Sequence, residues 1–310
     1  MENYWFFEKM KITITGATGF VGTNFIEYLK PIHELNSLSV RYVNNQKIEI
    51  NDNVVIHLAG KAHDLKKVSI PRDYYEANYE LTKQLFDAFL ISKACVFIFM
   101  STVKAVADEV KGILNENTIP NPKTHYGIAK HQAEEYILSK EIPDGKRVYI
   151  LRPCMIHGPE NKGNLNLLYQ FVAKGLPWPL GAFQNERSFL SIENLCFVIK
   201  ELLENERVPS GVYQIADDQS ISTNELIKLL GNSLDKKSII WNINSLFIKV
   251  LARIGGFLHL PLNSERLQKL TESYVVSNEK IIKAMGKPLP IPTEAGLMKT
   301  FESFKINNKL

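Results

Sequence analysis

Apolar residues in the first half of the chain alternate between short continuous runs and stretches with helical spacing. Continuous apolar runs are typical of strands buried on both faces, as in a parallel sheet. They lie at residues 10–15, 38–43, 54–59, 95–100 and 147–152, and the helical patterns lie at about 20–30, 73–91 and 125–140. Because strands and helices alternate in this order, we expect an α/β fold with a Rossmann-type, doubly wound parallel sheet.

The regular alternation ends after a loop-forming cluster of Gly, Pro and Asn at residues 158–164. Two later helix starts can be recognised: Ser222 with Glu225 forms a capping-box pattern, and Asn278 can cap another helix. We therefore expect a second, smaller α+β substrate domain that is interleaved with the first. The expected partition gives residues 10–162 to the first domain, with segments near 188–216 returning to it, and residues 163–187 and 217–305 to the smaller domain.

Composition and charge exclude few functions. Hydrophobic residues make up 45% of the 310 residues and charged residues 23%, which is typical of a globular protein. The net charge is +4 and the basic residues are scattered, which does not indicate a nucleic-acid partner but suits a small anionic ligand. The three cysteines lie far apart without a CxxC pair, which favours a reducing cytoplasm over a disulfide framework or a zinc site.

The most apolar stretch, residues 245–262, is interrupted by Lys249, Arg253 and His259. No stretch reaches transmembrane length, so we expect here an amphipathic helix packed on the protein and no stable membrane insertion. Attachment to a membrane surface is the alternative. The N-terminal residues lack the order of basic, apolar and small residues of a signal peptide, and Met10 is an alternative start.

Three glycines follow the first expected strand, at Gly16, Gly19 and Gly22. Glycine permits the tight turn between a strand and a helix, and it lets backbone amides approach a pyrophosphate. The pyrophosphate then meets the positive end of the helix that begins near Phe20. A glycine triplet in this context predicts dinucleotide binding.

The second expected strand bears on the choice between NAD and NADP. In NAD enzymes an acidic residue about 20 positions downstream binds the adenosine ribose, whereas a nearby arginine accommodates the phosphate of NADP. Arg41 lies in this region, and no acidic residue occurs between Glu34 and Glu49. The pattern favours NADP over NAD, with a surface role for Arg41 as the alternative. The segment 44–52 is also short and leaves little room for a helix or an acidic contact to adenine.

Tyr126 and Lys130 are four residues apart on an expected helix, so they share one face. A lysine ammonium beside a phenol favours the phenolate and lowers the pKa of the phenol. Such a phenol can shuttle a proton. Two ordinary residues of an amphipathic helix are the alternative.

Five motifs in order carry a resemblance to a known family. They are GATGFVG (16–22), HLAGKAHD (57–64), Ser101-Thr102, YGIAK (126–130) and RPCMIHGPE (152–160). With them the chain resembles the extended short-chain dehydrogenase/reductases, the nucleotide-sugar epimerase/dehydratase family, from about residue 10 to 305. The resemblance implies a catalytic set of Thr102, Tyr126 and Lys130. Tyr126 would move a proton at O4 during hydride transfer at sugar C4, Thr102 would hold O4, and Lys130 would also reach the nicotinamide ribose.

The resemblance also implies which residues bind the ligands. For the cofactor they are Gly16, Thr18, Gly19, Phe20, Val21, Gly22, Arg41, Leu58, Ala59, Gly60, Asn78, Tyr126, Lys130 and Pro153. For a UDP-sugar they are Lys61, Ser101, Lys104, Met155, Asn164, Arg187 and Arg266. Arg187, with Arg266 as a second candidate, would clamp the diphosphate, which a planar guanidinium suits.

Alternatives stay open for several of these residues. Asn78 can be an interior asparagine bonded to backbone, and Asn164 can have a loop-turn role. Arg187 can form a surface ion pair, and Lys104 can point to solvent. Ser101 can stand in for Thr102 as the catalytic hydroxyl.

Two departures from the family pattern narrow the expected reaction. Dehydratases of the family carry an Asp-Glu pair after the hydroxyl residue, but Val103-Lys104 follows Thr102 here, so 4,6-dehydration is not expected. Many 4-epimerases have asparagine where this chain has Met155, and a thioether cannot donate the same hydrogen bonds.

The stretches STVKAVAD (101–108), RPCMIHGP (152–159), GNLNLL (163–168) and GLPWPLGAFQNERSFLSIENL (175–195) resemble the bacterial reductases of UDP-4-keto-6-deoxy-N-acetylhexosamines. This resemblance implies a 4-ketoreductase of such a substrate. The alternative is a UDP-hexose or UDP-N-acetylhexosamine 4-epimerase.

Other classes of function explain fewer of these residues. A non-catalytic dinucleotide sensor would usually have lost Tyr126 or Lys130, and a reductase of small ketones would leave Arg187 without a purpose. The resemblance implies a homodimer through the helices near 73–91 and 125–140.

The histidines do not predict a metal site. His57 and His63 are close in sequence but lack an evident third ligand, and His57 is better explained as a core histidine. We expect His125 and His131 to face solvent. Cys154 is better explained as a small buried residue than as a nucleophile.

Overall fold

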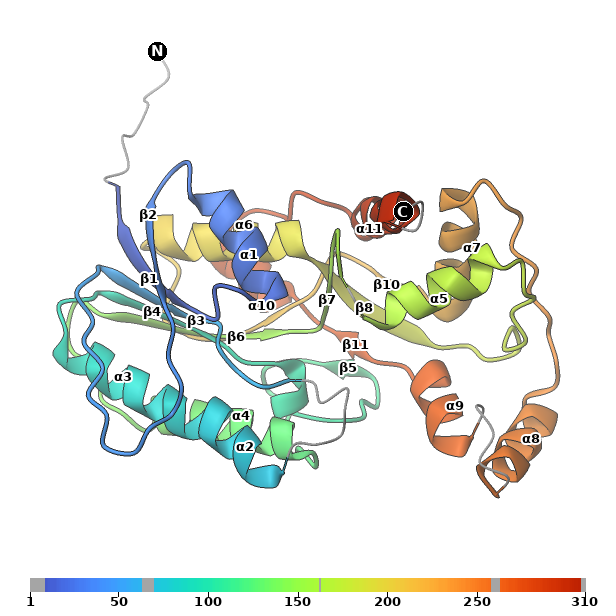
Figure 1. Ribbon diagram of the computed structural model, residues 1–310, viewed down its shortest axis with the longest axis horizontal. Helices are drawn as coiled ribbons and strands as arrows, with labels where there is room; N and C mark the ends of the chain where they lie inside the picture. The colour runs from blue at the N-terminus through green and yellow to red at the C-terminus, as the bar shows by residue number, and fades with distance from the viewer. Residues whose placement is uncertain (1–8, 63–69, 162, 258–262, 308–310) are drawn as a thin grey trace, which may run out of the picture.

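The computed structural model describes residues 9–62, 70–161, 163–257 and 263–307 (Figure 1). Six of the described strands form a parallel sheet with the order β2-β1-β3-β4-β6-β9. They are β1 (Lys11–Thr15), β2 (Glu34–Leu38), β3 (Val54–His57), β4 (Val96–Met100), β6 (Arg147–Pro153) and β9 (Gly211–Ile215). The strand order reverses between β1 and β3, and α/β sheets bind ligands in the crevice at such a point.

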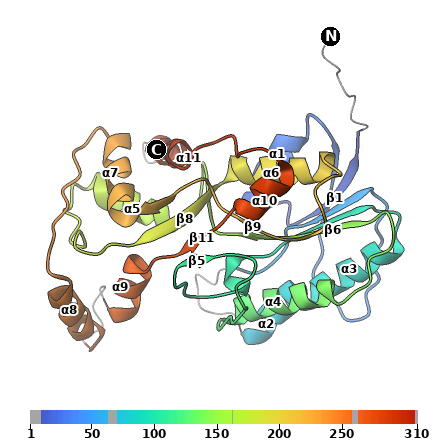
Figure 2. The same ribbon diagram turned by 180° about the vertical axis from the view of Figure 1, so that it is seen from behind.

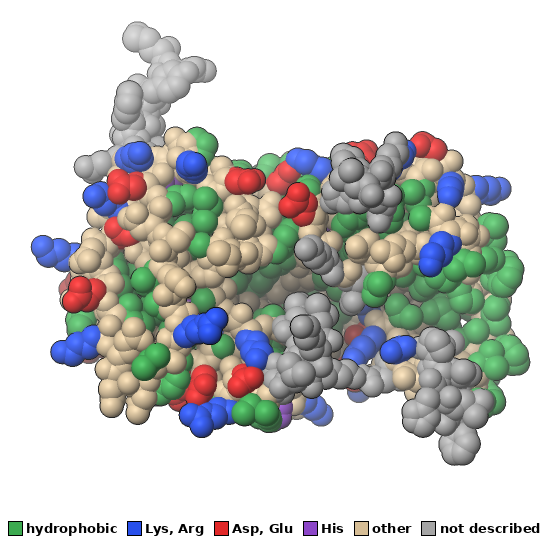
Figure 3. Space-filling view, in the orientation of Figure 1, with side chains coloured by type: hydrophobic (Ala, Val, Ile, Leu, Met, Phe, Trp, Pro, Cys, Tyr) green, Lys and Arg blue, Asp and Glu red, His purple; other side chains and the backbone are tan. Residues whose placement is uncertain are grey.

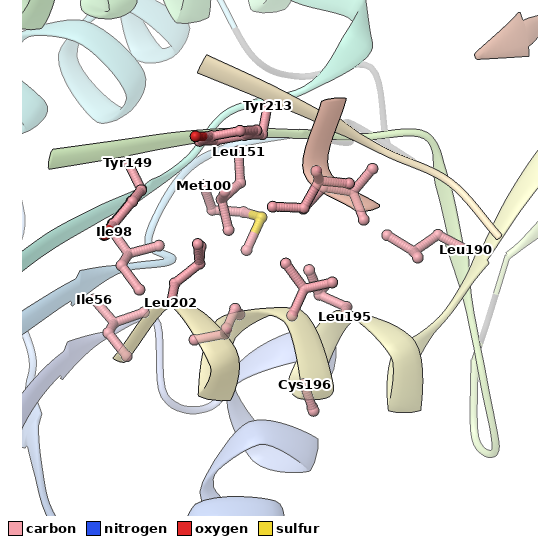
Figure 4. Packing of buried hydrophobic residues seen from close by; sticks show 14 of the residues in the cluster. Ile56, Ile98, Met100, Tyr149, Leu151, Leu190, Leu195, Cys196, Leu202 and Tyr213 are labelled. Atoms are coloured by element: carbon pink, nitrogen blue, oxygen red, sulfur yellow. The ribbon is translucent and has the colours of Figure 1, made fainter. Parts of the chain in front are cut away.

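Helices cover both faces of this sheet (Figures 1 and 2). One face carries α1 (Phe20–Leu29), α6 (Ile192–Glu204) and α10 (Glu279–Met285), and the other carries α3 (Leu81–Ile91) and α4 (His125–Leu138). On the first face, Leu195 and Leu202 of α6 pack against Ile98 and Met100 of the sheet (Figure 4). The doubly wound α/β architecture expected from the apolar runs is therefore confirmed.

The second strand lies earlier in the sequence than the apolar run 38–43 predicts. The strand β2 ends at Leu38, and residues 39–53 form neither helix nor strand. Val40 and Tyr42 instead pack as irregular chain against the apolar cluster under α3. Their alternating pattern thus reports burial and not strand pairing, and the absence of a helix in 44–52 agrees with the expectation.

A continuous helix spans α2 (Pro71–Tyr75), a π-helical turn η1 (Glu76–Glu80) and α3. The sequence predicts this helix but not its π turn. Such turns occur often at functional sites, and this one holds Asn78, which is fully buried.

The second half of the chain forms smaller sheets and a second apolar cluster. Strands β7 (Met155–His157), β8 (Glu186–Ser191) and β10 (Ser220–Ser222) form one sheet, and β5 (Ile113–Leu114) pairs with β11 (Val275–Val276). The helices are α5 (Asn164–Ala173), α7 (Thr223–Ser233), α8 (Ser245–Phe257), α9 (Ser264–Thr271) and α11 (Thr293–Asn307). Tyr169, Phe189 and Phe301 lie in their shared core.

The two expected helix starts behave differently. Ser222 and Glu225 form the capping box of α7, as predicted. Asn278 precedes α10, but its side chain donates to the carbonyl oxygens of Ala216 and Asp217 and makes no capping bond. Among the described helices, none is long and apolar enough to cross a membrane.

Candidate active site

The turn between β1 and α1 is shaped by two of its glycines. Gly16 has a φ of +72°, a conformation that favours glycine, and a Cβ there would lie 2.6 Å from the amide nitrogen of Ala59. A Cβ on Gly22 would lie 2.3 Å from the carbonyl oxygen of Gly16. Packing of the turn itself therefore requires both glycines.

Gly19 has a different role in this turn. A Cβ there would meet only the oxygen of Gly16, at 3.4 Å. Gly19 is the N-cap of α1, where no side chain makes a capping bond and the first turn holds no acidic residue. The first N–H groups of the helix are therefore not bonded by a capping side chain, and no nearby carboxylate cancels the positive potential at this end of α1. Open space beside free amides fits the pyrophosphate of a dinucleotide.

The next loop along this edge of the sheet, Leu58-Ala59-Gly60, adjoins the turn. A Cβ on Gly60 would lie 2.6 Å from Oδ1 of Asn78 and 3.1 Å from Nζ of Lys130. Asn78 accepts from the Lys61 amide (3.0 Å) and donates to the Lys61 carbonyl oxygen (3.1 Å). The side chain of Asn78 therefore holds the backbone of this loop. This is the alternative that the sequence left open, an interior asparagine bonded to backbone.

Close packing at the start of α4 brings Tyr126 to Thr102. Thr124 caps α4 by accepting from the Gly127 amide at 3.2 Å. A Cβ on Gly127 would lie 2.5 Å from the carbonyl oxygen of Lys104, so the helix rests directly on the 3-10 turn η2 (Val103–Ala105). This contact brings Tyr126 close enough to Thr102 for the threonine hydroxyl to act on the phenol.

The pKa of Tyr126 moves opposite to the direction that the Tyr-Lys spacing predicts. Burial disfavours the phenolate and raises the pKa to about 12, although the Thr102 hydroxyl opposes the rise. Lys130, the expected positive neighbour, is also only partly charged at neutral pH, because burial lowers its pKa to about 7. The Tyr126 phenol therefore stays protonated at neutral pH in this structure.

Lys130 is held between the sheet and the loop after β3. Its Nζ donates to the carbonyl oxygen of Met100 at 2.8 Å and lies 4.6 Å from the centre of the Phe99 ring. The negative charge of Glu134, one helical turn further, raises the pKa of Lys130 against the larger effect of burial. Only 3% of the lysine is exposed, so its amine is fixed in place.

A buried ion pair beneath this set was missed by sequence reasoning. Glu134 accepts from Nε of Arg152 at 3.0 and 3.1 Å, and the Ser101 hydroxyl donates to Glu134 as well. Burial acts to raise the pKa of Glu134, but the interactions with His131, Arg152 and Ser101 outweigh it and lower the pKa. Ser101 is therefore committed to Glu134, and the structure brings Thr102, not Ser101, to Tyr126. The spacing of Glu134 four residues after Lys130 is the signal that could have revealed it.

Arg187 on β8 is joined to the segment that follows α9. Its Nε donates to the carbonyl oxygen of Glu272 at 3.2 Å, and its guanidinium lies 3.7 Å from the Glu272 carboxylate. It also donates to the carbonyl oxygen of Lys269. Desolvation lowers the pKa of Arg187, and Glu272 opposes this. The expected ion pair is present, and the backbone contacts fix the direction of the guanidinium.

Lys104 lies close to Arg187 instead of pointing freely into solvent. Its Nζ donates to the carbonyl oxygen of Asp108 at 2.7 Å and lies 4.3 Å from the centre of the Tyr274 ring. Burial lowers the pKa of Lys104, and the positive charge of Arg187 lowers it further against opposing carboxylates. The two cations therefore lie near each other, and the carboxylate of Glu272 acts on both. Nothing in the sequence indicated that the ring of Tyr274 would pack against Lys104.

Other expected site residues lie on separate elements. Arg41 is exposed in the segment after β2, and Arg266 is exposed on α9. Lys61 forms an ion pair with Asp73 at 2.8 Å, and Met155 begins β7 with 37% of its surface exposed. Asn164 is the first residue of α5. The remaining cofactor candidates are Thr18, exposed in the glycine turn, Phe20 and Val21, half-buried at the start of α1, and Pro153, at the end of β6.

The histidine expectations are confirmed in part. His57 is fully buried between the hydroxyls of Thr15 and Thr82, as expected for a core residue. His125 is exposed, but His131 is half-buried with its ring 3.5 Å from the carboxylate of Glu135, because the helix turns it toward acidic neighbours. His63 lies outside the described residues.

Neither a metal nor a reactive thiol is indicated around this site. Burial raises the pKa of the Cys154 thiol. In the part of the chain that the structure describes, no three His, Cys, Asp or Glu side chains are grouped to hold a metal ion. A polar cavity of about 290 Å³ lies beside β2, and its lining shares no residue with the catalytic set.

The fold and the site together define an enzyme of the extended short-chain dehydrogenase/reductase type. Residues 12–216 match the model of the NAD dependent epimerase/dehydratase family. This is more than half of the chain, and the chain therefore belongs to that family, whose members are NAD-dependent enzymes acting on nucleotide sugars.

Three curated relatives cover most of the chain. The UDP-glucose 4-epimerase of Vibrio cholerae is 28% identical, over 96% of this chain and 97% of the relative. The N-acetyl-alpha-D-glucosaminyl-diphospho-ditrans,octacis-undecaprenol 4-epimerase of Escherichia coli O157:H7 is also 28% identical, over 88% and 84%. The UDP-2-acetamido-2,6-beta-L-arabino-hexul-4-ose reductase of Pseudomonas aeruginosa is 23% identical, over 85% and 66%.

Solved structures share the fold and differ in cofactor. The Bordetella bronchiseptica enzyme WbmG in complex with NAD has a TM-score of 0.73 and 16% identity, over 96% of this chain and 95% of the other. RMD from Pseudomonas aeruginosa complexed with NADPH has a TM-score of 0.70 and 20% identity, over 95% and 99%. Proteins of this fold thus bind either cofactor.

Proposed function

We propose that this enzyme reduces the 4-keto group of a UDP-4-keto-6-deoxy-N-acetylhexosamine. The observation that carries the proposal is the arrangement at the start of α4: the Tyr126 phenol lies beside the Thr102 hydroxyl, and Val103 and Lys104, not an acidic pair, follow Thr102. A protonated phenol is the proton donor that a ketone reduction needs. Elimination would need an additional acid and base, which Val103 and Lys104 do not provide.

The chain's own residues divide the work as follows. A bound reduced nicotinamide supplies the hydride to C4. Tyr126 donates its proton to O4, and the Thr102 hydroxyl holds that oxygen in line. Lys130, whose amine is held by the carbonyl oxygen of Met100, would orient the ribose side of the cofactor. In its protonated form it would also stabilise the phenolate that forms when Tyr126 gives up its proton.

Arg187 and Lys104 are proposed to bind the diphosphate of the substrate. Arg187 lies close enough to Lys104 to lower its pKa, and a phosphate between them would relieve that repulsion. The carbonyl oxygens of Lys269 and Glu272 direct the guanidinium. Asn164, Met155 and Arg266 are proposed to line the remainder of the nucleotide-sugar site.

We favour NADP(H) over NAD(H) as the cofactor. Arg41 follows the carboxyl end of β2, on the same edge of the sheet as the glycine turn, where an arginine suits the extra phosphate.

We also propose a cytoplasmic homodimer through α3 and α4, because Ile91 and Leu138 on these helices are 91% and 58% exposed.

A 4-epimerase is the second candidate, and similarity favours it. Two relatives that are 28% identical over most of their length carry that name. Epimerisation begins with removal of a proton from O4, which requires the Tyr126 phenolate. Met155 stands where many 4-epimerases of the family have an asparagine, and this departure supports the reductase over the epimerase.

The absorbance of reduced nicotinamide distinguishes the two reactions. The purified protein is mixed with UDP-4-keto-6-deoxy-N-acetylglucosamine and NADPH, and in parallel with NADH. The proposal expects loss of one reduced-cofactor equivalent per substrate, faster with NADPH. If neither cofactor is consumed while a UDP-hexose or UDP-N-acetylhexosamine is interconverted with its C4 epimer, the 4-epimerase is the correct assignment.

A further inference from the structure

Helix α8 exposes apolar side chains where a surface helix usually exposes polar ones. Leu246, Phe247, Val250, Leu251 and Ile254 are 42–69% exposed. The amphipathic helix expected from the sequence is therefore present, but its wider apolar side faces outward.

The two sides of α8 can be separated by helical geometry. At 3.6 residues per turn, the five exposed apolar side chains fall within an arc of about 140°. Ile248 and Ala252, which are 4% and 1% exposed, point to the opposite side and hold the helix on the second apolar cluster. Lys249 and Arg253 are exposed and border the apolar arc.

The exposed apolar surface continues into the segment before α8. Ile239 and Trp241 are each 52% exposed. Of the eighteen large hydrophobic side chains exposed among the described residues, seven lie within residues 239–254, which we name the α8 surface. In Figure 3, hydrophobic side chains gather at this end of the molecule, beside α5 and α7 and toward α8. Such clustering marks an interaction site.

Charge identifies the partner of the α8 surface. No acidic residue occurs between Asp235 and Glu265, whereas Lys236, Lys237, Lys249 and Arg253 lie in that interval. We infer that the α8 surface docks on an anionic phospholipid bilayer, with α8 lying in the plane of the interface. The apolar arc would enter the boundary of headgroups and acyl chains by about 5–10 Å, and the bordering cations would meet lipid phosphates.

Two further features favour lipid over a second protein. Trp241, with its apolar ring and polar N–H, suits a membrane–water interface. Lys249 and Arg253 lie beyond one edge of the arc, where long basic side chains can reach lipid phosphates while their apolar stems cover the helix. Docking would hold the substrate-binding half of the molecule at the bilayer, because α8 contacts α9 and residues at the end of α9 orient Arg187.

Vesicle co-sedimentation of the full chain tests this inference. Vesicles of phosphatidylcholine alone are compared with vesicles that contain phosphatidylglycerol. We expect binding to the anionic vesicles that is weakened by salt, with a blue shift of tryptophan fluorescence that Trp241→Phe removes. Each basic side chain near an anionic surface contributes about fivefold in affinity, so Lys249→Glu with Arg253→Glu should weaken binding at least about 25-fold. Phe247→Gln with Val250→Gln should also abolish sedimentation.

Matched controls change equally exposed residues elsewhere. Lys93→Glu with Lys111→Glu, and Val43→Gln with Ile119→Gln, should leave vesicle binding unchanged; all four residues are exposed and lie outside the α8 surface. The inference is overturned if the native chain ignores anionic vesicles or if the controls lose as much binding as the α8 variants. It is also overturned if light scattering finds an oligomer that the α8 variants dissociate, since a second copy would then cover this surface.

Discussion

The glycine turn and the region of Arg187 hold their functional groups in different ways. At the turn, contacts between backbone atoms fix Gly16 and Gly22, and no side chain orients the amides of α1. Arg187 is instead oriented by a carbonyl oxygen that lies 85 residues further along the chain, at Glu272. The first arrangement is local in sequence and tolerates little change of shape. The second depends on the packing of distant segments and tolerates little change of charge.

Tyr126→Phe should have the largest effect, because it removes the proton donor of the reaction. General acid catalysis contributes about 10²–10⁴-fold, so kcat should fall by about that factor in the nicotinamide assay. Dinucleotide affinity, measured by fluorescence titration, should not change. Tyr28→Phe, on α1, is the matched control. Retained turnover in Tyr126→Phe would exclude the assigned role.

Arg152→Met should destabilise the fold beneath the catalytic helix. It leaves the Glu134 carboxylate buried without its cation, and such losses cost about 3–5 kcal/mol. Denaturant titration gives the free energy of unfolding, with Arg207→Met, an exposed arginine, as the control. An effect no larger than that of the control would show that the pair does not support α4.

The loss in Arg152→Met should depend on pH in a defined direction. In the native chain the folded pKa of Glu134 lies below 4.5, so its stabilisation is present above pH 4.5 and is lost as the pH falls through the folded value. Without Arg152 the buried carboxyl prefers its proton. The difference in unfolding free energy should therefore be largest at neutral pH and shrink on acidification; a constant difference would contradict this.

Arg187→Ala tests the other half of the comparison. Hydrogen bonds to a charged group contribute about 1.5–3 kcal/mol, so affinity for UDP should fall about tenfold to a hundredfold in calorimetry. Affinity for the dinucleotide and the unfolding free energy should stay close to those of Arg207→Ala. A loss of stability with unchanged UDP affinity would mean that the ion pair with Glu272 is structural only.

Two alanine substitutions distinguish a glycine that the packing of the turn requires from a glycine that leaves room for the ligand. Gly22→Ala places a Cβ 2.3 Å from a backbone oxygen and should reduce the unfolding free energy by about 1–3 kcal/mol. Gly19→Ala meets no such clash, so it should keep its stability and lose dinucleotide affinity. Equal effects on stability would show that Gly19 serves the fold as well.

Sequence reasoning reached the local features of the molecule and missed the long-range ones. The strands around β1, β3, β4 and β6 and the glycine turn follow from apolar runs and nearby glycines. The end of β2 was misplaced because Val40 and Tyr42 pack without pairing. The pairing of Lys104 with Tyr274 joins segments that only the folded chain brings together, and the raised pKa of Tyr126 depends on burial, which spacing cannot measure.

The transfer of an isotopic label tests the central claim most directly. The enzyme is supplied with UDP-4-keto-6-deoxy-N-acetylglucosamine and with NADPH carrying deuterium on the transferred position of the nicotinamide, and the product is examined by NMR. The account predicts one deuterium at C4 of the sugar and a product proton on O4 from Tyr126 that exchanges with solvent. Unlabelled C4, or deuterium at another carbon, would contradict a hydride transfer at C4.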